Sequence, residues 1–367
     1  MLSGDPKLSD PDSVVSKRMA SYGTLAERIF IIVTAEGKNY QLAQNVFVYP
    51  VGRGLPVLRK NSIVKKAVEI IKKENLTPAD TLVTCQDPFD LGEAGITLKK
   101  KFGMKLEIQI HGDIFSPWFA KQSVLHKLRV SKAPKVLVLA DKIRVVSSAI
   151  KDSLLGIVPE HKIYVLPIAI DKNTMGENKN FLPNKYPGFG LIMLIVARLE
   201  PEKNVAVAIR LLKKILTIEP RAGLVVVGDG SQRKNLESLS RKLRVREHVS
   251  FEGWKEDVTD YFASCHLYLQ TSFFEGYGMA VAEAAMNGKA ILSTDVGLAH
   301  DLATLSATVV VPVDNEEELF TQAKFLLNQE KRNILGIAAQ KVIGSLVFSR
   351  EKYLQKQGEQ WKNMLQK

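Results

Sequence analysis

The sequence predicts an α/β protein built from two parallel sheets, each covered by helices. Short runs of β-branched residues alternate with amphipathic helical stretches along the whole chain, which is typical of strand and helix units in parallel sheets. Residues 171–189, rich in Asn, Gly and Pro, interrupt this alternation, and it restarts after them. With 367 residues, 46% of them hydrophobic, the chain is long enough for two domains that each bury a core.

The first domain is expected to span residues 1–170. Its strands are predicted at residues 28–34, 45–51, 81–86, 106–111, 142–147 and 162–168. Residues 12–26 have the periodicity of the helix that follows a first strand, and residues 1–3 resemble the end of that strand. We therefore expect the first strand to be incomplete at its amino end.

Residues 171–189 are expected to link the domains, and residues 190–349 to form the second one. Its strands are predicted at residues 191–197, 223–227, 249–253, 267–270, 290–293 and 308–313. A last amphipathic helix is predicted at residues 350–366, with Tyr353, Trp361 and Leu365 available for packing.

Composition narrows the class of protein. The two cysteines, Cys85 and Cys265, lie in apolar runs that suit small buried side chains, so we expect no disulfide framework and a reducing compartment, the cytoplasm. No run approaches the roughly 20 apolar residues needed to cross a bilayer. The first residues lack the basic and apolar regions of a signal peptide.

The net charge of +12 is concentrated in the first half. Residues 1–170 hold 25 Lys and Arg against 16 Asp and Glu, a net charge of +9. Eleven basic residues lie between Lys99 and Arg144. Such a patch attracts anions, so it could face an anionic membrane surface, a lipid-phosphate acceptor or nucleic acid, or it could simply be a solvated surface.

Ligands of open parallel sheets bind at the carboxyl ends of the strands, where four segments draw attention. The turn at residues 197–204, ARLEPEKN, places Arg198 and Lys203 between a strand and a helix. Two cations there can hold a diphosphate, and the helix N-terminus adds partial positive charge. The alternative is an ordinary charged loop.

Two further segments follow strands in the second half. Gly228, in VGDGS, lets the backbone approach a ligand closely, although tight turns also need glycine for conformational reasons alone. In residues 271–284, TSFFEGYGMAVAEA, Glu275 precedes a predicted helix and Glu283 lies inside it. A carboxylate there suits the paired hydroxyls of a ribose or sugar. A helix N-terminus also favours acidic residues, which is a rival explanation for Glu275 but a poor one for Glu283.

The fourth segment, IHGD at residues 110–113, ends a strand of the first half. His111 is a candidate catalytic residue with Asp113 as its orienting partner, and the alternative is a structural histidine.

Together these segments resemble the retaining GT-B glycosyltransferases of family 4, the glycosyl transferases group 1. The resemblance rests on the E-x7-E element from Glu275 to Glu283, the A-R-L-x-P-x-K-N turn and the V-V-G-D-G turn. It is thinner in the first half, where DSVVSKRM at residues 12–19 and the His111-Gly112 pair carry it.

The resemblance implies GT-B architecture, two Rossmann-like domains facing across a cleft. The first domain would hold the acceptor, a glycan or lipid-linked molecule, and the last helix, 350–367, would join it. The second would hold the nucleotide diphosphate sugar. The reaction would retain anomeric configuration and need neither a metal nor a cofactor, and the enzyme would be cytoplasmic, at most peripheral at the membrane.

The resemblance also implies roles for single residues. Arg198 and Lys203 would stabilise the departing diphosphate, and Glu283 would bind the ribose. Glu275 and the backbone of Gly276, Tyr277 and Gly278 would bind the transferred sugar. His111 would lie near the reacting sugar, and the nucleobase would contact the backbone around Gly253 and Trp254.

Three rival functions remain. Another GT-B enzyme, such as a nucleotide-sugar 2-epimerase or a sugar phosphorylase, would share these motifs. A nucleic-acid-binding protein would fit the pI of about 9.4, but the basic patch lacks interleaved aromatic residues. A dehydrogenase would need a strand-coupled G-x-G-x-x-G with a following acid, which the sequence lacks.

Overall fold

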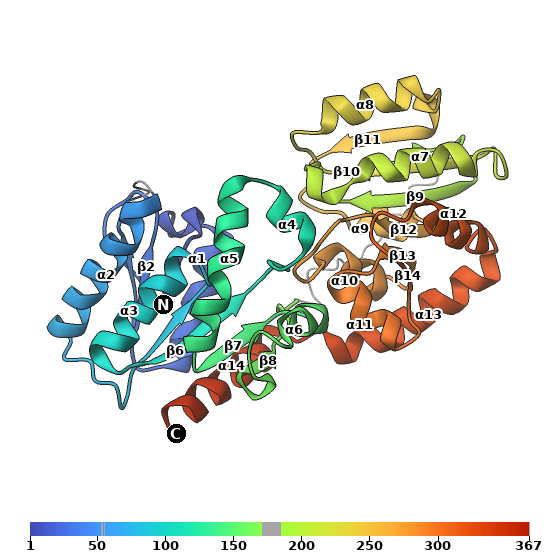
Figure 1. Cartoon of the computed structure of the whole chain (residues 1–367). Coiled ribbons are helices and arrows are strands. Elements are labelled where there is room, and N and C mark those ends of the chain that lie inside the picture. Colours follow the sequence, from blue (N-terminus) through green and yellow to red (C-terminus); the bar gives the residue numbers. More distant parts are fainter. Residues whose placement is uncertain (53, 55, 171–184, 367) are drawn as a thin grey trace. The chain divides into compact units, whose positions relative to one another are not determined.

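The computed structural model describes residues 1–52, 54, 56–170 and 185–366, which form two compact α/β units (Figure 1). Unit 1 contains the described residues of Met1–Val146, Ile150–Ile168 and Ser349–Lys367. Unit 2 contains those of Ser147–Ala149 and Ala169–Phe348. Most of the predicted linker, residues 171–184, lies outside the described residues.

The sheet of unit 1 has eight strands in the order β3-β4-β2-β1-β5-β6-β7-β8, parallel throughout except for the antiparallel β3–β4 pair. Its strands are β1 (Leu2–Ser3), β2 (Ile29–Val33), β3 (Tyr40–Ala43), β4 (Val46–Pro50), β5 (Leu82–Cys85), β6 (Lys105–Ile110), β7 (Lys142–Val145) and β8 (Ile163–Val165). The α-helices of the first half are α1 (Val14–Ala20), α2 (Pro56–Lys73), α3 (Asp90–Phe102), α4 (Pro117–Lys121), α5 (Val124–Leu139) and α6 (Ser148–Leu154).

Two details of the first half differ from the sequence-based expectation. The six predicted strands are confirmed, but the edge strand β3 was not predicted, because its four partly exposed residues are too few to show an alternation. The helix predicted at residues 12–26 was too long. α1 ends at Ala20 and a 3-10 helix follows over Ser21–Leu25, where Gly23 disfavours a continuous α-helix.

The last helix, α14 (Arg350–Leu365), packs on unit 1 through a buried carboxylate. Glu107 of β6 is fully buried and accepts hydrogen bonds from Gln357 Nε2 and Trp361 Nε1, each at 3.1 Å. The hydroxyl of Tyr164 on β8 donates to the same carboxylate. An unpaired buried carboxylate is costly, so these donors fix α14 against the sheet of unit 1.

The sheet of unit 2 has six parallel strands in the order β11-β10-β9-β12-β13-β14. They are β9 (Leu191–Val196), β10 (Ala222–Val227), β11 (Val249–Gly253), β12 (Leu267–Gln270), β13 (Ala290–Thr294) and β14 (Val309–Val311), and all six were predicted. The α-helices are α7 (Val205–Ile215), α8 (Arg233–Lys242), α9 (Thr259–Ser264), α10 (Met279–Met286), α11 (Leu298–Thr304), α12 (Glu316–Phe325) and α13 (Gln329–Leu346).

Strand order fixes where a ligand can bind in unit 2. From β9 the chain winds outward through β10 to β11, and it then returns to β12 and winds the other way through β13 to β14. The winding therefore reverses between the neighbours β9 and β12. Loops leave such a point in opposite directions and open a crevice at the carboxyl ends of the strands.

The short described part of the predicted linker packs on unit 2. The rings of Tyr186 and Phe189 stack with centroids 5.7 Å apart. Lys185 Nζ and the Tyr186 hydroxyl both donate to Glu252 of β11, at 2.5 and 2.8 Å. Lys185–Phe189 is thus anchored to the edge strand of this sheet.

Candidate active site

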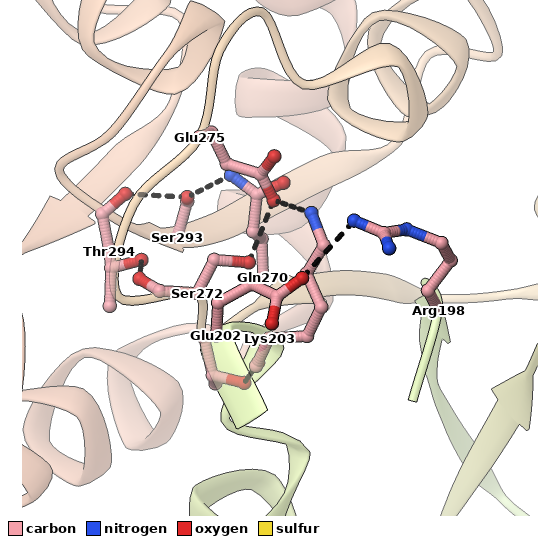
Figure 2. Close-up of polar contacts among 9 residues, drawn as sticks. Arg198, Glu202, Lys203, Gln270, Ser272, Glu275, Ser293 and Thr294 are labelled. Carbon is pink, nitrogen blue, oxygen red and sulfur yellow. Dashed lines mark hydrogen bonds and ion pairs between the residues drawn. The ribbon is translucent and has the colours of Figure 1, made fainter. Parts of the chain in front are cut away.

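An ion pair joins the two loops at the point where the winding reverses. Lys203, in the turn after β9, places its Nζ 2.6 Å from Oε1 of Glu275, in the loop after β12 (Figure 2). The side chains are only 15% and 12% exposed, so water screens this pair less than a surface pair. The sequence singled out both residues but not their contact, which only the strand order explains.

Hydrogen bonds hold the same two loops together. The Thr271 hydroxyl after β12 donates to the carbonyls of Lys203 and Asn204 at 3.2 and 3.1 Å. The Phe273 amide donates to the Glu202 carbonyl at 2.8 Å. Asn204 begins α7 in the left-handed region, with φ at 47°, which asparagine tolerates better than most residues. The backbone that carries Lys203 is therefore held in place before any ligand binds.

Arg198 lies beside this pair and is far more open. Its guanidinium contacts Glu202 Oε1 at 3.1 Å, while the side chain is 73% exposed (Figure 2). A pair whose cation is this exposed contributes little to stability, because water screens its charge. An anionic ligand can therefore draw Arg198 away from Glu202 at little cost.

Glu283 differs from Glu275 in its surroundings. It lies in the second turn of α10 and is half-buried, and within the described part of the chain no hydrogen bond or ion pair to its carboxylate is found. Desolvation, and then the negative charge of Asp257, raises the pKa of Glu283 to about 7. A half-buried carboxylate without a protein partner is suited to accept hydrogen bonds from a ligand.

The two carboxylates share one neighbourhood. Burial raises the pKa of the Tyr268 hydroxyl on β12, and the charges of Glu275 and Glu283 raise it further. Both acids therefore lie near enough to Tyr268 to act on its hydroxyl.

The backbone between them is shaped by glycine. Gly278 precedes α10 with φ at 91°, a conformation that residues with a side chain rarely adopt. Tyr277 turns its side chain inward, where it is 3% exposed and its hydroxyl donates to the Leu346 carbonyl at 3.4 Å. Only the backbone of Gly276, Tyr277 and Gly278 can therefore bind a ligand here.

Gly228 is required by its own turn. A Cβ at this position would lie 1.9 Å from the Ala197 carbonyl oxygen, and φ is 132°. Its amide donates to the Gly253 carbonyl at 2.8 Å, which joins the ends of β10 and β11. The next residue, Trp254, is 72% exposed. The conformational explanation for Gly228 is thus sufficient, and a role in binding stays a prediction.

His111 lies in unit 1, at the end of β6. The expected contact with Asp113 is wrong: His111 Nε2 lies 3.2 Å from Gln109 Oε1, and Asp113 Oδ1 accepts the Phe115 amide. Desolvation and the positive charges of Arg144 and Arg18 lower the pKa of His111. His111 is exposed, so desolvation lowers its pKa only in part, but the two guanidinium groups lower the same pKa by their positive charge. His111 is therefore neutral at pH 7.

Sequence reasoning missed the polar residues that support Glu275. The Ser272 hydroxyl donates to Glu275 Oε1 at 2.8 Å, and the hydroxyl of Thr294, the last residue of β13, donates to the Ser272 carbonyl at 2.6 Å. Gln270 Nε2 donates to the Ser293 hydroxyl at 3.1 Å (Figure 2). The available signal was the run of polar residues that ends two otherwise apolar strands.

Only some of the basic residues in the predicted patch are exposed. Arg144 is 2% exposed and stacks on Tyr353, and Lys99 pairs with Asp141 at 2.6 Å. Its exposed lysines lie on α3, at Lys100 and Lys101, and on α4 and α5. We call the part on α4 and α5, with the exposed apolar side chains among its lysines, the α5 surface. It consists of Lys121, Val124, Leu125, Lys127, Leu128, Lys132 and Lys135.

Two searches of the described residues complete the description. None of the helices they form is both long and apolar enough to span a bilayer. They also contain no group of three or more His, Cys, Asp or Glu side chains placed to hold a metal ion.

Comparisons with known proteins find a similar family and similar proteins for the second half of the chain. Residues 179–342 match the family model described as Glycosyl transferases group 1. A stretch of 146 residues is 27% identical to the phosphatidylinositol N-acetylglucosaminyltransferase gpi3 subunit of Schizosaccharomyces pombe, covering 39% of this chain and 31% of that protein.

A second curated relative comes from Campylobacter jejuni. Over 141 residues the chain is 29% identical to N-acetylgalactosamine-N,N'-diacetylbacillosaminyl-diphospho-undecaprenol 4-alpha-N-acetylgalactosaminyltransferase, covering 38% of each protein. The matched segments thus span about a third of the length of these two relatives.

The fold is similar to a solved structure over nearly its whole length. Anabaena Alr3699/HepE in complex with UDP superposes with a TM-score of 0.75 and 18% identity, covering 99% of this chain and 98% of that one. The chain therefore has the α/β fold of GT-B glycosyltransferases, and its residues 179–342 are similar to the glycosyl transferases group 1 family.

The Lys203–Glu275 pair should stabilise unit 2 even without ligand. Lys203→Met leaves a mostly buried carboxylate without its cation, so we expect a loss of about 1–3 kcal/mol, seen as a lower urea midpoint by circular dichroism. Lys214→Met is the matched control, because Lys214 pairs with a Glu317 that is 82% exposed. Equal midpoints for the two variants would contradict a structural role for the pair.

Glu283 should make the stability of unit 2 depend on pH. Its folded pKa of about 7 lies above the usual value of 4.5, so the folded state holds the proton more tightly than the unfolded state. The contribution of Glu283 to stability should be largest below pH 4.5 and fall as pH rises to about 7. Thermal melts of Glu283→Gln against the unchanged protein should isolate this component. A difference between the two that is constant from pH 4.5 to 7.5 would exclude it.

Proposed function

We propose that this protein transfers a sugar from a nucleotide diphosphate sugar to a glycan or lipid-linked acceptor, with retention of anomeric configuration. The observation that carries the proposal is the ion pair of Lys203 and Glu275 where the winding of the sheet reverses, with Arg198 open beside it. Cations at that point suit a diphosphate, and the acids suit sugar hydroxyls.

In this proposal the diphosphate leaves as the bond between the anomeric carbon and the phosphate oxygen breaks. Arg198 and Lys203 stabilise the negative charge that develops on that oxygen, so neither a metal ion nor a cofactor is required. The acceptor hydroxyl attacks the face from which the diphosphate departs, and its proton passes to a phosphate oxygen. This order of events retains the anomeric configuration.

The remaining residues bind and orient. Glu283 accepts two hydrogen bonds from the ribose hydroxyls, and Glu275 binds the transferred sugar with the backbone of Gly276, Tyr277 and Gly278. The exposed Trp254 and the backbone of Gly253 contact the nucleobase. His111, neutral at pH 7, contacts the reacting sugar through a ring nitrogen. A nucleotide-sugar 2-epimerase with the same donor site remains the second candidate.

The nucleotide is best sought by a binding screen. We expect a UDP-sugar to raise the melting temperature most, because the solved relative was crystallised with UDP, and ligand at 100 times its Kd stabilises the fold by about 2.7 kcal/mol. GDP- and ADP-sugars are the comparison. The proposal fails if none of these donors shifts the melt at millimolar concentration.

The ribose contact can be tested by pH. A nucleotide sugar does not ionise near neutral pH, so a rise in donor affinity between pH 6 and pH 8 would report the ionisation of Glu283, whose pKa is about 7. Calorimetric titration should show this rise, and Glu283→Gln should bind more weakly and lose the pH dependence. An unchanged pH profile in the variant would remove Glu283 from the donor site.

We propose that the acceptor is linked to lipid and that the enzyme works in the cytoplasm at an anionic membrane surface. The α5 surface contacts this bilayer and does not bind nucleic acid. Leu128 is 54% exposed and Val124 is 78% exposed, and both lie among lysines. Apolar side chains within a basic surface match the interface of an anionic bilayer. The names of the two curated relatives, which contain phosphatidylinositol and diphospho-undecaprenol, agree with such an acceptor.

Vesicle flotation tests this surface. Vesicles with one third phosphatidylglycerol should carry more protein than pure phosphatidylcholine vesicles, and Leu125→Ser with Leu128→Ser should lower the bound fraction with both. Ile334→Ser with Ile337→Ser on α13 is the matched control, since these side chains are 61% and 68% exposed but lie in unit 2. Equal flotation with both lipids would exclude an electrostatic membrane contact.

A further inference from the structure

Two polar side chains lie buried on β6, a strand inside the sheet of unit 1 between β5 and β7. Glu107 is fully buried and Gln109 is 2% exposed. Strands in the middle of parallel sheets are usually apolar on both faces, because a buried polar group is costly without hydrogen-bond partners. The bonds that fix α14 account for Glu107, but they leave the amide of Gln109 to be explained.

The amide of Gln109 is held at both of its polar atoms. Its Nε2 donates to Glu107 Oε2 at 2.8 Å and to Thr84 Oγ1 at 3.0 Å. Its Oε1 accepts a hydrogen bond from Arg144 Nη1 at 3.2 Å. A guanidinium group has donors only, so the amide atom that faces Arg144 must be the oxygen. The orientation of the Gln109 amide is therefore fixed by its partners.

Arg144 is itself held in place. Its Nε and Nη2 both donate to the Leu166 carbonyl, at 3.3 and 3.2 Å. The carbon at the centre of its guanidinium group lies 5.0 Å from the centre of the Tyr353 ring. Because this side chain is buried, water does not compete for its hydrogen bonds. Oε1 of Gln109 thus keeps one position in the folded protein.

This oxygen selects one tautomer of His111. Nε2 of the ring lies 3.2 Å from Gln109 Oε1, and a carbonyl oxygen only accepts, so Nε2 carries the hydrogen. Desolvation and the positive charges of Arg144 and Arg18 lower the pKa of His111, so the ring holds a single proton at pH 7. Nδ1 therefore keeps its lone pair. In the part of the chain that the structure describes, no hydrogen bond to this nitrogen is found.

We propose that Gln109 is a positioning residue, which holds His111 in the Nε2–H tautomer and leaves Nδ1 as the acceptor for a substrate hydroxyl. An acceptor nitrogen binds a hydroxyl but cannot donate a proton to a phosphate oxygen. Within the proposed function, on which this contact rests, His111 therefore binds the transferred sugar and takes no part in protonating the departing diphosphate. Glu107 acts on the ring only through Gln109.

The tautomer can be observed by NMR in the ligand-free protein. When the histidine rings are labelled in nitrogen, correlation of the carbon-bound ring protons with both nitrogens shows which nitrogen carries hydrogen. The signals of His111 are those that disappear in His111→Gln. At pH 7 we expect the hydrogen on Nε2. Hydrogen found mainly on Nδ1 of the unchanged protein would overturn the proposal without any further variant.

Gln109→Met removes the acceptor and keeps a side chain of similar length. The ratio of the Nδ1–H form to the Nε2–H form should then rise about fivefold, which is what one hydrogen bond contributes to such an equilibrium. Gln357→Met is the matched control, because Gln357 is also buried and its Nε2 donates to the same carboxylate from α14. Both variants should melt at a lower temperature, but only Gln109→Met should change the tautomer ratio of His111.

An unchanged ratio in Gln109→Met, or an equal change in Gln357→Met, would leave Gln109 a structural role alone and overturn the proposal. These measurements need no nucleotide sugar. A confirmed tautomer in a protein that no nucleotide sugar stabilises would therefore contradict the proposed function and support the role of Gln109 toward His111.

Discussion

The candidate site depends on one interaction, the ion pair of Lys203 with Glu275. It joins the loop after β9 to the loop after β12, where the winding of the sheet of unit 2 reverses. The charges neutralise each other while the site is free of ligand, which allows a cation to stand in a mostly buried position. In the proposed function, a diphosphate that binds Lys203 shares or displaces Glu275, so donor binding is linked to the position of Glu275.

The surrounding residues divide between support and binding. Ser272 and Thr294 hold the Glu275 loop, and Thr271 holds the turn that carries Lys203. The hydroxyl groups of these three residues have hydrogen-bond partners within the protein. Arg198 and Glu283 differ, since one is mostly exposed and the other has no partner among the described residues. Groups of this second kind have hydrogen-bonding capacity left for a substrate.

Much of the fold could be predicted from sequence because parallel strands are continuous apolar runs. β9 and β10 are examples, and every residue of β10 is buried. β3 could not be found in this way, because it lies at an edge and is partly exposed. Residue types and spacing also located Lys203 and Glu275 beside strand ends. Their contact followed from strand order, which a single sequence does not reveal.

Other errors came from side chains whose partners are distant in sequence. Arg144 was counted in a surface patch, yet it is buried against Tyr353 of α14, more than 200 residues away along the chain. His111 was given Asp113 as its partner because the two are close in sequence, but Gln109 on the same strand reaches its ring. Period-two spacing places Gln109 of β6 and His111, just after the strand, on the same side of the extended backbone, and the sequence-based expectation did not use that signal.

The account rests on Glu275 holding Lys203 until a diphosphate arrives, and calorimetric titration of a nucleoside diphosphate without a sugar tests this directly. Lys203→Met should weaken binding at least tenfold, while Glu275→Gln should tighten it, because the cation is then released from its competitor and a like charge is removed from the anion. If Glu275→Gln instead weakened binding of the diphosphate as strongly as Lys203→Met does, the ion pair would not be the element that prepares this site.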